Sequence, residues 1–407
     1  MHINRRAALT GGAALALASS KRGRAQARPT IRLGALVDMS GEYSANTGPN
    51  AVVCARQAVT EFNASSHGFD VELIQADHQN KPDIGASIAR QWCDQGIDAI
   101  VAVPTSSVAL AVAEVAKEKN KVMLGSESST AALTDTQCSP NTVIWSLDTY
   151  SLAYALGTAV VKRGGMSWFF VAADYAFGHG ISELASDIVK KAGGSVKGTI
   201  FHPFPGTTDF SSYLQTAQAS GAQVLCLANG GTDTQNCIKQ AHEFGLTETM
   251  TIAPLIAVIG DIHSLGDLGA GLDVVSSFYW DFNDRSRAFA RRVLPNMVDH
   301  AYPNWFFAST YSLTLHYLKT VAAMGASEAK KSGRDTVARM KGIPTDDDAF
   351  GQGRIRADGR GEFPAYLFRT KAPSKPGGWD LYEHLETIPA SEALHPLNPK
   401  CVFPITT

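Results

Sequence analysis

The stretch VPTSSVALAVAEVAKEKNKVMLGSESSTAALT, residues 103–134, predicts two strand ends that are each followed by hydroxyl side chains. The apolar run of residues 99–103 reads as a buried strand that ends at Pro104. Apolar residues then recur at helical spacing from residue 108 to residue 115, which predicts a helix directly after the strand. A second short strand is expected at residues 122–124, before the next hydroxyl cluster.

The two hydroxyl clusters are candidates for a ligand site. Carboxyl ends of parallel strands meet at one edge of a sheet, where small ligands usually bind. A helix that begins there adds unpaired N–H groups and partial positive charge. The alternative is that these residues only cap helices, for which Ser and Thr are favoured. Because two clusters are adjacent, the sequence favours a small polar ligand that is anionic at one end. The clusters are Thr105, Ser106 and Ser107, and Ser126, Ser128, Ser129 and Thr130.

Strands and helices alternate along most of the chain, which is typical of a parallel sheet covered by helices on both faces. The alternation runs through residues 30–139 and restarts in residues 151–280. We therefore predict an α/β protein with two similar lobes and a cleft between them. Crossings between the lobes are expected near residues 145–150 and 281–284. The Pro-rich end of the chain reads as loop.

The first 27 residues read as an export signal and not as part of the fold. They have a basic start, an apolar Ala/Leu/Gly stretch and a small-x-small end at residues 25–27. Arg5 and Arg6 resemble a twin-arginine signal, but the motif is incomplete, so general secretion stays open. No later stretch reaches the ~20 apolar residues that span a bilayer. We therefore expect a soluble periplasmic protein.

The charge of the mature chain limits its partners. Of the 36 Lys and Arg residues, five lie in the signal, which leaves 31 basic and 38 acidic residues and a formal net charge of −7. A negative surface argues against nucleic acid and anionic membranes as partners. None of the sequence motifs of nucleophile elbows, dinucleotide or phosphate loops, or zinc proteases occurs. The sequence thus indicates neither an enzyme nor a cofactor, and no metal site is expected.

Six cysteines follow no zinc or redox spacing. Cys54, Cys93 and Cys226 lie in apolar runs and are predicted to be buried thiols. Cys138 and Cys401 lie in loop-like segments that contain Pro, and export to an oxidising compartment permits disulfides. We therefore hypothesise that these two residues pair and fix the C-terminal tail.

Taken together, the segments resemble those of leucine/isoleucine/valine-binding proteins, the periplasmic solute-binding proteins of ABC importers. The resemblance covers nearly the whole mature chain and lies in the order and spacing of its segments. These are IRLGALVDMSGEYSANTGPNA (31–51), ADHQNKPD (76–83), PTSSVALAVAE (104–114), CSPNT (138–142), ADYAFG (173–178), LANGGTD (227–233), FYWDFND (278–284) and RIRADGRGEFPAYLF (354–368).

This resemblance implies two Rossmann-like lobes that are joined by a three-strand hinge and close around one small molecule. Lobe I would comprise residues 28–147 and 282–362, and lobe II residues 148–281 and 363–407. The implied partners are a small-molecule ligand and a membrane ABC permease, and a monomer is expected. A sensor with the same clamshell, reporting to a receptor, is the alternative role.

The resemblance also places the ligand contacts. The hydroxyl clusters would hold a ligand carboxylate, through Thr105, Ser106, Ser107, Ser126, Ser128 and Ser129. Tyr43 would close over the ligand, and the second lobe would offer Tyr175, Phe177, Asn229 and Asp233, with Trp280 near a crossing. Core packing is an equal alternative for Tyr175 and Phe177, a structural role is favoured for Trp280, and Asn229 could belong to a simple turn.

The ligand class depends on two departures from the family pattern. Where amino-acid binders place an acid for the ligand ammonium, residues 253–256 read Ala-Pro-Leu-Ile, and a buried ammonium without a countercharge is costly. Together with the aromatic candidates, this favours an aromatic carboxylate of the benzoate or hydroxycinnamate type. Branched-chain amino acids remain the alternative if Asp233 or Asp281 replaces the acid. Glu127 is the second departure, since in the cleft it would favour a short amide, a urea or an amine.

Overall fold

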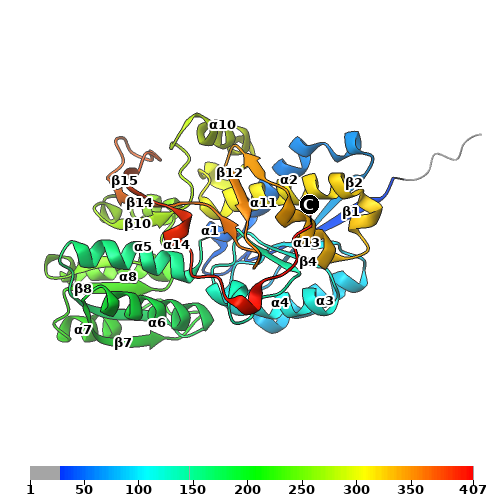
Figure 1. Cartoon of the computed structure of the whole chain (residues 1–407). Coiled ribbons are helices and arrows are strands. Elements are labelled where there is room, and N and C mark those ends of the chain that lie inside the picture. Colours follow the sequence, from blue (N-terminus) through cyan, green and yellow to red (C-terminus); the bar gives the residue numbers. More distant parts are fainter. Residues whose placement is uncertain (1–27, 146, 407) are drawn as a thin grey trace, which may run out of the picture.

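The computed structural model describes residues 28–145 and 147–406, so the expected export signal lies outside the described residues. Two α/β lobes lie side by side in Figure 1. The first is drawn mainly in blue, cyan and yellow, and the second in green. The predicted fold class, two lobes with parallel sheets, is confirmed.

The first lobe is built on a five-stranded parallel sheet with the order β2-β1-β3-β4-β5. Alternate residues of its strands face opposite layers, as the period of two requires. Leu36 packs with α3 and α4 on one face, whereas Leu33 packs with α11 and α13 on the other. The strands are β1 (Thr30–Val37), β2 (Asp70–Asp77), β3 (Ala99–Ala102), β4 (Val122–Gly125) and β5 (Thr142–Ile144). The helices are α1 (Ser44–Thr47), α2 (Pro49–Phe62), α3 (Pro82–Asp94), α4 (Ser106–Glu118), α10 (Asp284–Val293), α11 (Trp305–Met324), α12 (Ala326–Ala329) and α13 (Gly333–Gly342).

The second lobe repeats this architecture with a four-stranded parallel sheet of order β7-β6-β8-β9. An antiparallel sheet, β10-β14-β15, adjoins it. The strands of the parallel sheet are β6 (Ser167–Ala173), β7 (Ser195–His202), β8 (Val224–Ala228) and β9 (Thr251–Pro254). Those of the antiparallel sheet are β10 (Asp273–Ser276), β14 (Ala365–Thr370) and β15 (Tyr382–Ile388). Its helices are α5 (Thr149–Lys162), α6 (Ala176–Lys191), α7 (Ser211–Ala219), α8 (Thr232–Glu243), α9 (Ile259–Leu265) and α14 (Ala390–Ala393).

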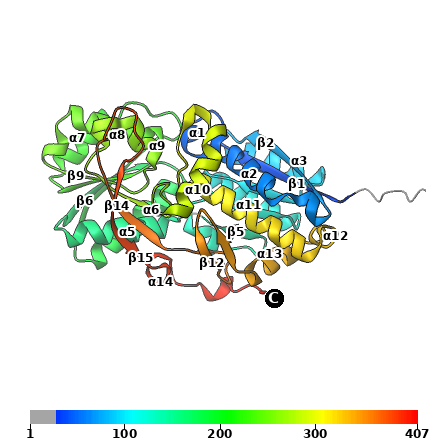
Figure 2. The same ribbon diagram turned by 90° about the horizontal axis from the view of Figure 1, so that it is seen from above.

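Three links between strands and helices connect the lobes, and the tail after α14 crosses a fourth time: the links run from β5 to α5, from β10 to α10, and from the small antiparallel sheet β11-β12-β13 to β14. That small sheet comprises β11 (Thr345–Asp347), β12 (Gly351–Ile355) and β13 (Gly361–Glu362). In Figure 2, α10 and α11 run from the junction of the lobes along the first lobe, beside α2. Short 3-10 helices are η1 (Ala64–His67), η2 (Ala131–Thr134), η3 (Leu246–Glu248), η4 (Gly266–Gly269), η5 (Leu294–Asn296), η6 (Val298–His300) and η7 (Pro399–Cys401).

The C-terminal segment differs from its predicted loop structure. Residues 382–388 form β15, which was missed because its middle residues are exposed and, apart from Leu385, polar or charged, while only Tyr382 and Ile388 are buried. Beyond α14 the chain returns to the first lobe, where Thr406 N–H donates to the carbonyl of Ala338. The expected placement of residues 363–407 in lobe II therefore does not describe the contacts of this last stretch.

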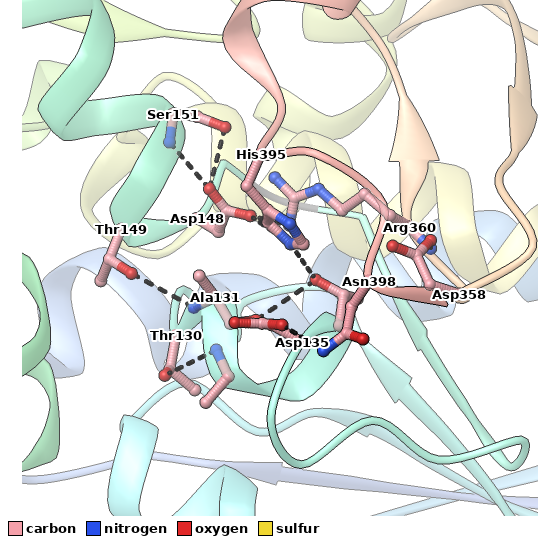
Figure 3. Close-up of polar contacts among 12 residues, drawn as sticks. Thr130, Ala131, Asp135, Asp148, Thr149, Ser151, Asp358, Arg360, His395 and Asn398 are labelled. Carbon is pink, nitrogen blue, oxygen red and sulfur yellow. Dashed lines mark hydrogen bonds and ion pairs between the residues drawn. The ribbon is translucent and has the colours of Figure 1, made fainter. Parts of the chain in front are cut away.

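The predicted disulfide between Cys138 and Cys401 is confirmed. It joins the C-terminal tail to the loop before β5, and Asn398 of the tail donates to Asp135 of the same loop at 2.6 Å (Figure 3). Cys54, Cys93 and Cys226 are free and buried, as predicted, and so is Cys237. The tail is thus held on the first lobe by one covalent bond and several polar contacts.

Candidate ligand-binding site

A cavity of about 40 Å³ lies where the carboxyl edges of the two sheets face each other. The first lobe contributes residues around α1, the start of α4, the turn after β4 and the start of α11. The second lobe contributes the start of α6 and the loops after β8 and β9. The lining residues are Tyr43, Asn46, Thr47, Pro104, Ser106, Glu127, Ser129, Tyr175, Phe177, Gly230, Gly231, Ile256, Val258, Asp261 and Phe306.

The start of α4 brings one side chain of the first hydroxyl cluster to the cavity. Ser106 is almost fully buried and lines it, whereas Ser107 is partly exposed and does not. Thr105 is the residue before the helix, but its hydroxyl donates to Oδ1 of Asn80 and makes no capping bond to α4. The N–H groups of the first turn of α4 therefore receive no cap from Thr105. They lie beside the Ser106 hydroxyl in the cavity wall.

Most of the second hydroxyl cluster supports the backbone. The hydroxyl of Ser128 donates to the carbonyl of Val103 at 2.7 Å, and Ser126 lies 2.9 Å from Oγ1 of Thr310. Val103 has φ of +58°, a conformation that a β-branched residue rarely adopts, so its position depends on such contacts. Ser129 alone lines the cavity, and its Oγ has no hydrogen-bond partner among the described residues.

The segment after this cluster forms only the 3-10 turn η2, and α5 begins beside it, since the N–H of Thr149 donates to the carbonyl of Ser129 at 2.7 Å. The hydroxyl of Thr130 accepts from the N–H of Ala132 there and serves as a cap. The capping alternative thus describes Thr130, whereas Ser106 and Ser129 remain available to a ligand.

Glu127 lies in the cavity wall and is only 1% exposed. Oγ1 of Thr310 donates to its Oε1 at 3.3 Å, and its Oε2 has no partner among the described residues. Burial raises the pKa of Glu127 well above its usual value, and the Thr310 hydrogen bond opposes this only in part. The orientation that the sequence could not decide is therefore toward the cavity.

Aromatic side chains form the opposite wall and connect the lobes. The hydroxyls of Tyr43 and Tyr175 lie 2.8 Å apart, one from each lobe. Phe204 stacks on both rings, at centroid distances of 5.3 Å and 4.3 Å respectively. Phe177 lines the cavity beside Tyr175, and Phe306 lines it from the start of α11. The structure thus brings Tyr43, Tyr175 and Phe177 together as expected, while Phe204 and Phe306 were missed.

A polar contact holds the lobes closed beside these rings. Nδ2 of Asn46 donates to both carboxyl oxygens of Asp261, at 2.9 and 3.1 Å. Asp261 also accepts from Gln235 at 2.8 Å and from the N–H of Val258 at 2.9 Å, while burial raises its pKa. Oδ1 of Asn46 is buried and without a partner among the described residues. Sequence reasoning missed this pair, although Asp261 follows the Ala253–Ile256 segment, where an acid was sought, by five residues.

Four further candidates lie away from the cavity lining. Asn229 is buried and contacts His202 and Thr234, and the indole N–H of Trp280 donates to the carbonyl of Trp379 at 2.9 Å. Asp233 is buried behind the tyrosines, and burial, followed by the charge of Glu42, raises its pKa to about 7. Asp281 pairs with Arg287 at 2.9 Å.

The character of the cavity is therefore apolar and aromatic, with hydroxyl and carboxyl groups at its ends. None of its lining residues is Lys, Arg or His. Within residues 28–145 and 147–406, no group of three or more His, Cys, Asp and Glu side chains could hold a metal ion. In the same described part of the chain, no helix has both the length and the apolarity needed to cross a membrane.

Comparison with known proteins agrees with this architecture. A family model described as periplasmic binding protein matches residues 30–376. A Burkholderia mallei periplasmic binding protein of known crystal structure is 39% identical, with a TM-score of 0.85 over 92% of this chain and 98% of that chain. A Burkholderia xenovorans protein, described as a branched-chain amino acid ABC transporter periplasmic ligand-binding protein, is 34% identical, with a TM-score of 0.77 over 90% and 97%.

A more distant structure shares the fold alone. It is an ABC transporter solute-binding protein from Rhodopseudomonas palustris in complex with p-hydroxybenzoic acid. It is 20% identical, with a TM-score of 0.79 over 89% of this chain and 97% of that chain. No curated protein sequence matches the chain.

Proposed function

We propose that this chain, which belongs to the periplasmic binding protein family, closes around an aromatic carboxylate and delivers it to the membrane permease of an ABC importer. The family is one of transport components and not of enzymes. A benzoate or hydroxycinnamate type of ligand is the specific proposal, and binding as a monomer goes with it.

The observation that carries this proposal is the cavity lining. Tyr43, Tyr175, Phe177 and Phe306 supply flat apolar surface in the cavity wall. Aromatic rings pack well against such surfaces, and small-molecule sites typically combine them with a few polar groups. Ser106 and the start of α4 offer hydroxyl and N–H donors at one end, which suits a carboxylate. The p-hydroxybenzoic acid complex from Rhodopseudomonas palustris supports the proposal only in that the same fold can enclose such a molecule.

A branched-chain amino acid is the second candidate, and two observations favour it. Asp261 is an acid in the cavity wall, and the relative from Burkholderia xenovorans is described as part of a branched-chain amino acid transporter. However, Asp261 already accepts hydrogen bonds from Asn46, Gln235 and Val258. An ammonium group would therefore compete with bonds that hold the lobes together, which favours the aromatic acid. A short amide or urea is the third candidate, because Oδ1 of Asn46 is a free acceptor.

A thermal-shift screen of residues 28–407 tests the ligand class. Benzoate, 4-hydroxybenzoate and hydroxycinnamates are expected to raise the melting temperature, since a ligand at a hundredfold excess over its Kd adds ~2.7 kcal/mol of stability. Leucine, isoleucine, valine, benzamide and urea are expected to give no shift. A shift with leucine-type ligands alone would contradict the proposal. Loss of uptake of the bound acid on deletion of the protein would separate an importer component from a sensor.

The replacement Ser106→Ala is expected to weaken binding of the aromatic acid about tenfold. It removes a hydroxyl donor to the carboxylate, which is worth roughly 1.5 kcal/mol. The melting temperature of the unliganded protein should stay unchanged, because this hydroxyl makes no hydrogen bond to the other described residues. Titration calorimetry gives the first quantity and a thermal melt the second.

Ser128→Ala serves as the matched control for this serine. Its hydroxyl holds the carbonyl of Val103, so its loss should lower the stability of the unliganded protein by about 1 kcal/mol. Equal affinity of the Ser106→Ala variant and the parent protein would instead show that Ser106 is only a buried helix residue.

A further inference from the structure

We propose that Glu127 binds the ligand as a neutral carboxylic acid and donates the hydrogen of Oε2 to the ligand carboxylate. The inference rests on the proposed aromatic carboxylate and makes Glu127 a determinant of specificity at that site. Glu127 is then a proton-bearing donor beside the hydroxyls of Ser106 and Ser129, which line the same cavity.

The contacts of Glu127 are consistent with a neutral acid. Thr310 donates to Oε1 at 3.3 Å, which satisfies the carbonyl oxygen of a protonated group. Oε2 has no partner among the described residues, although Glu127 is 99% shielded from solvent, so only a cavity molecule remains to pair with it. The serines offer alcohol hydroxyls and the start of α4 offers N–H groups. A protonated Oε2 would add an acidic O–H donor to these.

No nearby charge supports an ionised Glu127. From α2, the thiol of Cys54 lies close enough to interact, and burial raises the pKa of this thiol well above its usual value, so it is neutral. From α11, the neighbours are Thr310 and Phe306. The titratable groups in the rest of the cavity wall are Tyr43, Tyr175 and Asp261, of which the tyrosines are neutral and the acid is anionic or neutral. A buried carboxylate without a cation is costly, and a second carboxylate beside it increases the cost.

The consequence is that binding of an anionic ligand requires a proton on Glu127. Burial raises the pKa of Glu127 well above its usual value, which favours the protonated group in the protein without a ligand. Above the pKa of the unliganded protein, binding has to take up one proton. The apparent Kd for a carboxylate therefore increases by about tenfold per pH unit in that range and is constant below it. A cationic ligand would show the opposite dependence.

Titration calorimetry with benzoate between pH 5.5 and pH 9.5 tests this inference. Benzoate is a suitable probe, because it does not titrate in this range, unlike a phenolic acid. The parent protein should lose affinity as the pH increases. Glu127→Gln keeps the size of the side chain and a neutral N–H donor, so its affinity should be within about threefold of the parent at pH 6 and independent of pH. Glu127→Ala should bind at least tenfold more weakly at pH 6.

The outcomes separate this inference from the proposed function. Benzoate binding that is equally tight at every pH in the parent protein and in Glu127→Ala, or that is abolished by Glu127→Gln while this variant keeps the parent melting temperature, overturns the role of Glu127 alone. Tighter binding of benzylamine than of benzoate, with affinity that increases with pH, assigns Glu127 to a cation instead. Absence of binding by any aromatic acid overturns the ligand class and this inference together. Infrared difference spectra on adding benzoate should also show the carbonyl band of a protonated carboxyl group, which Glu127→Gln removes.

Discussion

A protein in which Cys138 and Cys401 are both replaced by Ser is expected to lose about 4 kcal/mol of unfolding free energy relative to the disulfide-bonded protein. The two cysteines are separated by 263 residues, so the bond closes a very long loop in the unfolded chain. The entropy that a cross-link removes from the unfolded state increases with loop length. Removing a natural disulfide typically costs about 2–5 kcal/mol of unfolding free energy. Urea unfolding of both proteins, followed by circular dichroism, measures the difference.

Other contacts set the limits of this expectation. Asn398 donates to Asp135, and Nε2 of His395 lies 3.0 Å from Oγ1 of Thr134, so the tail is also held without the covalent bond. A difference below about 1 kcal/mol would show that these contacts keep the tail in place and that the reduced chain is already restricted. Dithiothreitol provides the control, because it should lower the stability of the parent protein toward that of the double variant and leave the variant unchanged.

The sequence was sufficient for features that depend on local pattern. The apolar periodicity of residues 108–115 predicts a helix, and α4 forms there. The same holds for the strands that precede the hydroxyl clusters, because buried parallel strands are short apolar runs. The disulfide could be predicted for a similar reason, since only two cysteines lie in loop-like segments.

The candidate site was harder to predict from the sequence, because its residues become neighbours only when the lobes meet. Phe204 and Asp261 belong to the second lobe, yet each contacts a residue of the first, Tyr43 and Asn46 respectively. No spacing in the sequence records such a contact. Hydroxyl residues presented a second difficulty, because the residue type does not tell whether the group faces a ligand or the backbone. Ser128 supports the strained end of β3, whereas Ser129 next to it lines the cavity.

The buried ion pair at the crossings is the second place where a single replacement should have a large effect. Arg360 is 1% exposed and its Nη1 lies 3.6 Å from Oδ2 of Asp148, which is fully buried (Figure 3). Asp148 precedes α5 and its Oδ1 accepts from the N–H and the hydroxyl of Ser151, so it also caps this helix. The neighbouring pair of Arg356 and Asp358 balances its own charge at 2.6 Å. Asp148 is therefore the principal countercharge of Arg360.

We expect Asp148→Asn to lower the free energy of unfolding by about 3 kcal/mol. The amide oxygen can still accept from Ser151, so the helix cap is retained, but the Arg360 charge is left buried without its partner. Removing one member of a buried pair costs about 3–5 kcal/mol, whereas replacing both members by groups of similar size is often nearly neutral. The double variant Asp148→Asn/Arg360→Met should therefore be more stable than Asp148→Asn alone.

Urea unfolding of the two single variants, the double variant and the parent protein forms a thermodynamic cycle for this pair. Lys331→Ala is a suitable control, because it breaks an exposed ion pair with Glu328 and should leave the stability almost unchanged. If the double variant is less stable than the parent protein by the sum of the two single effects, the two charges do not interact, and Arg360 is stabilised by Asp358 instead. A double variant that recovers most of the stability would show that the junction of the lobes depends on the balance of these buried charges, and not on their presence.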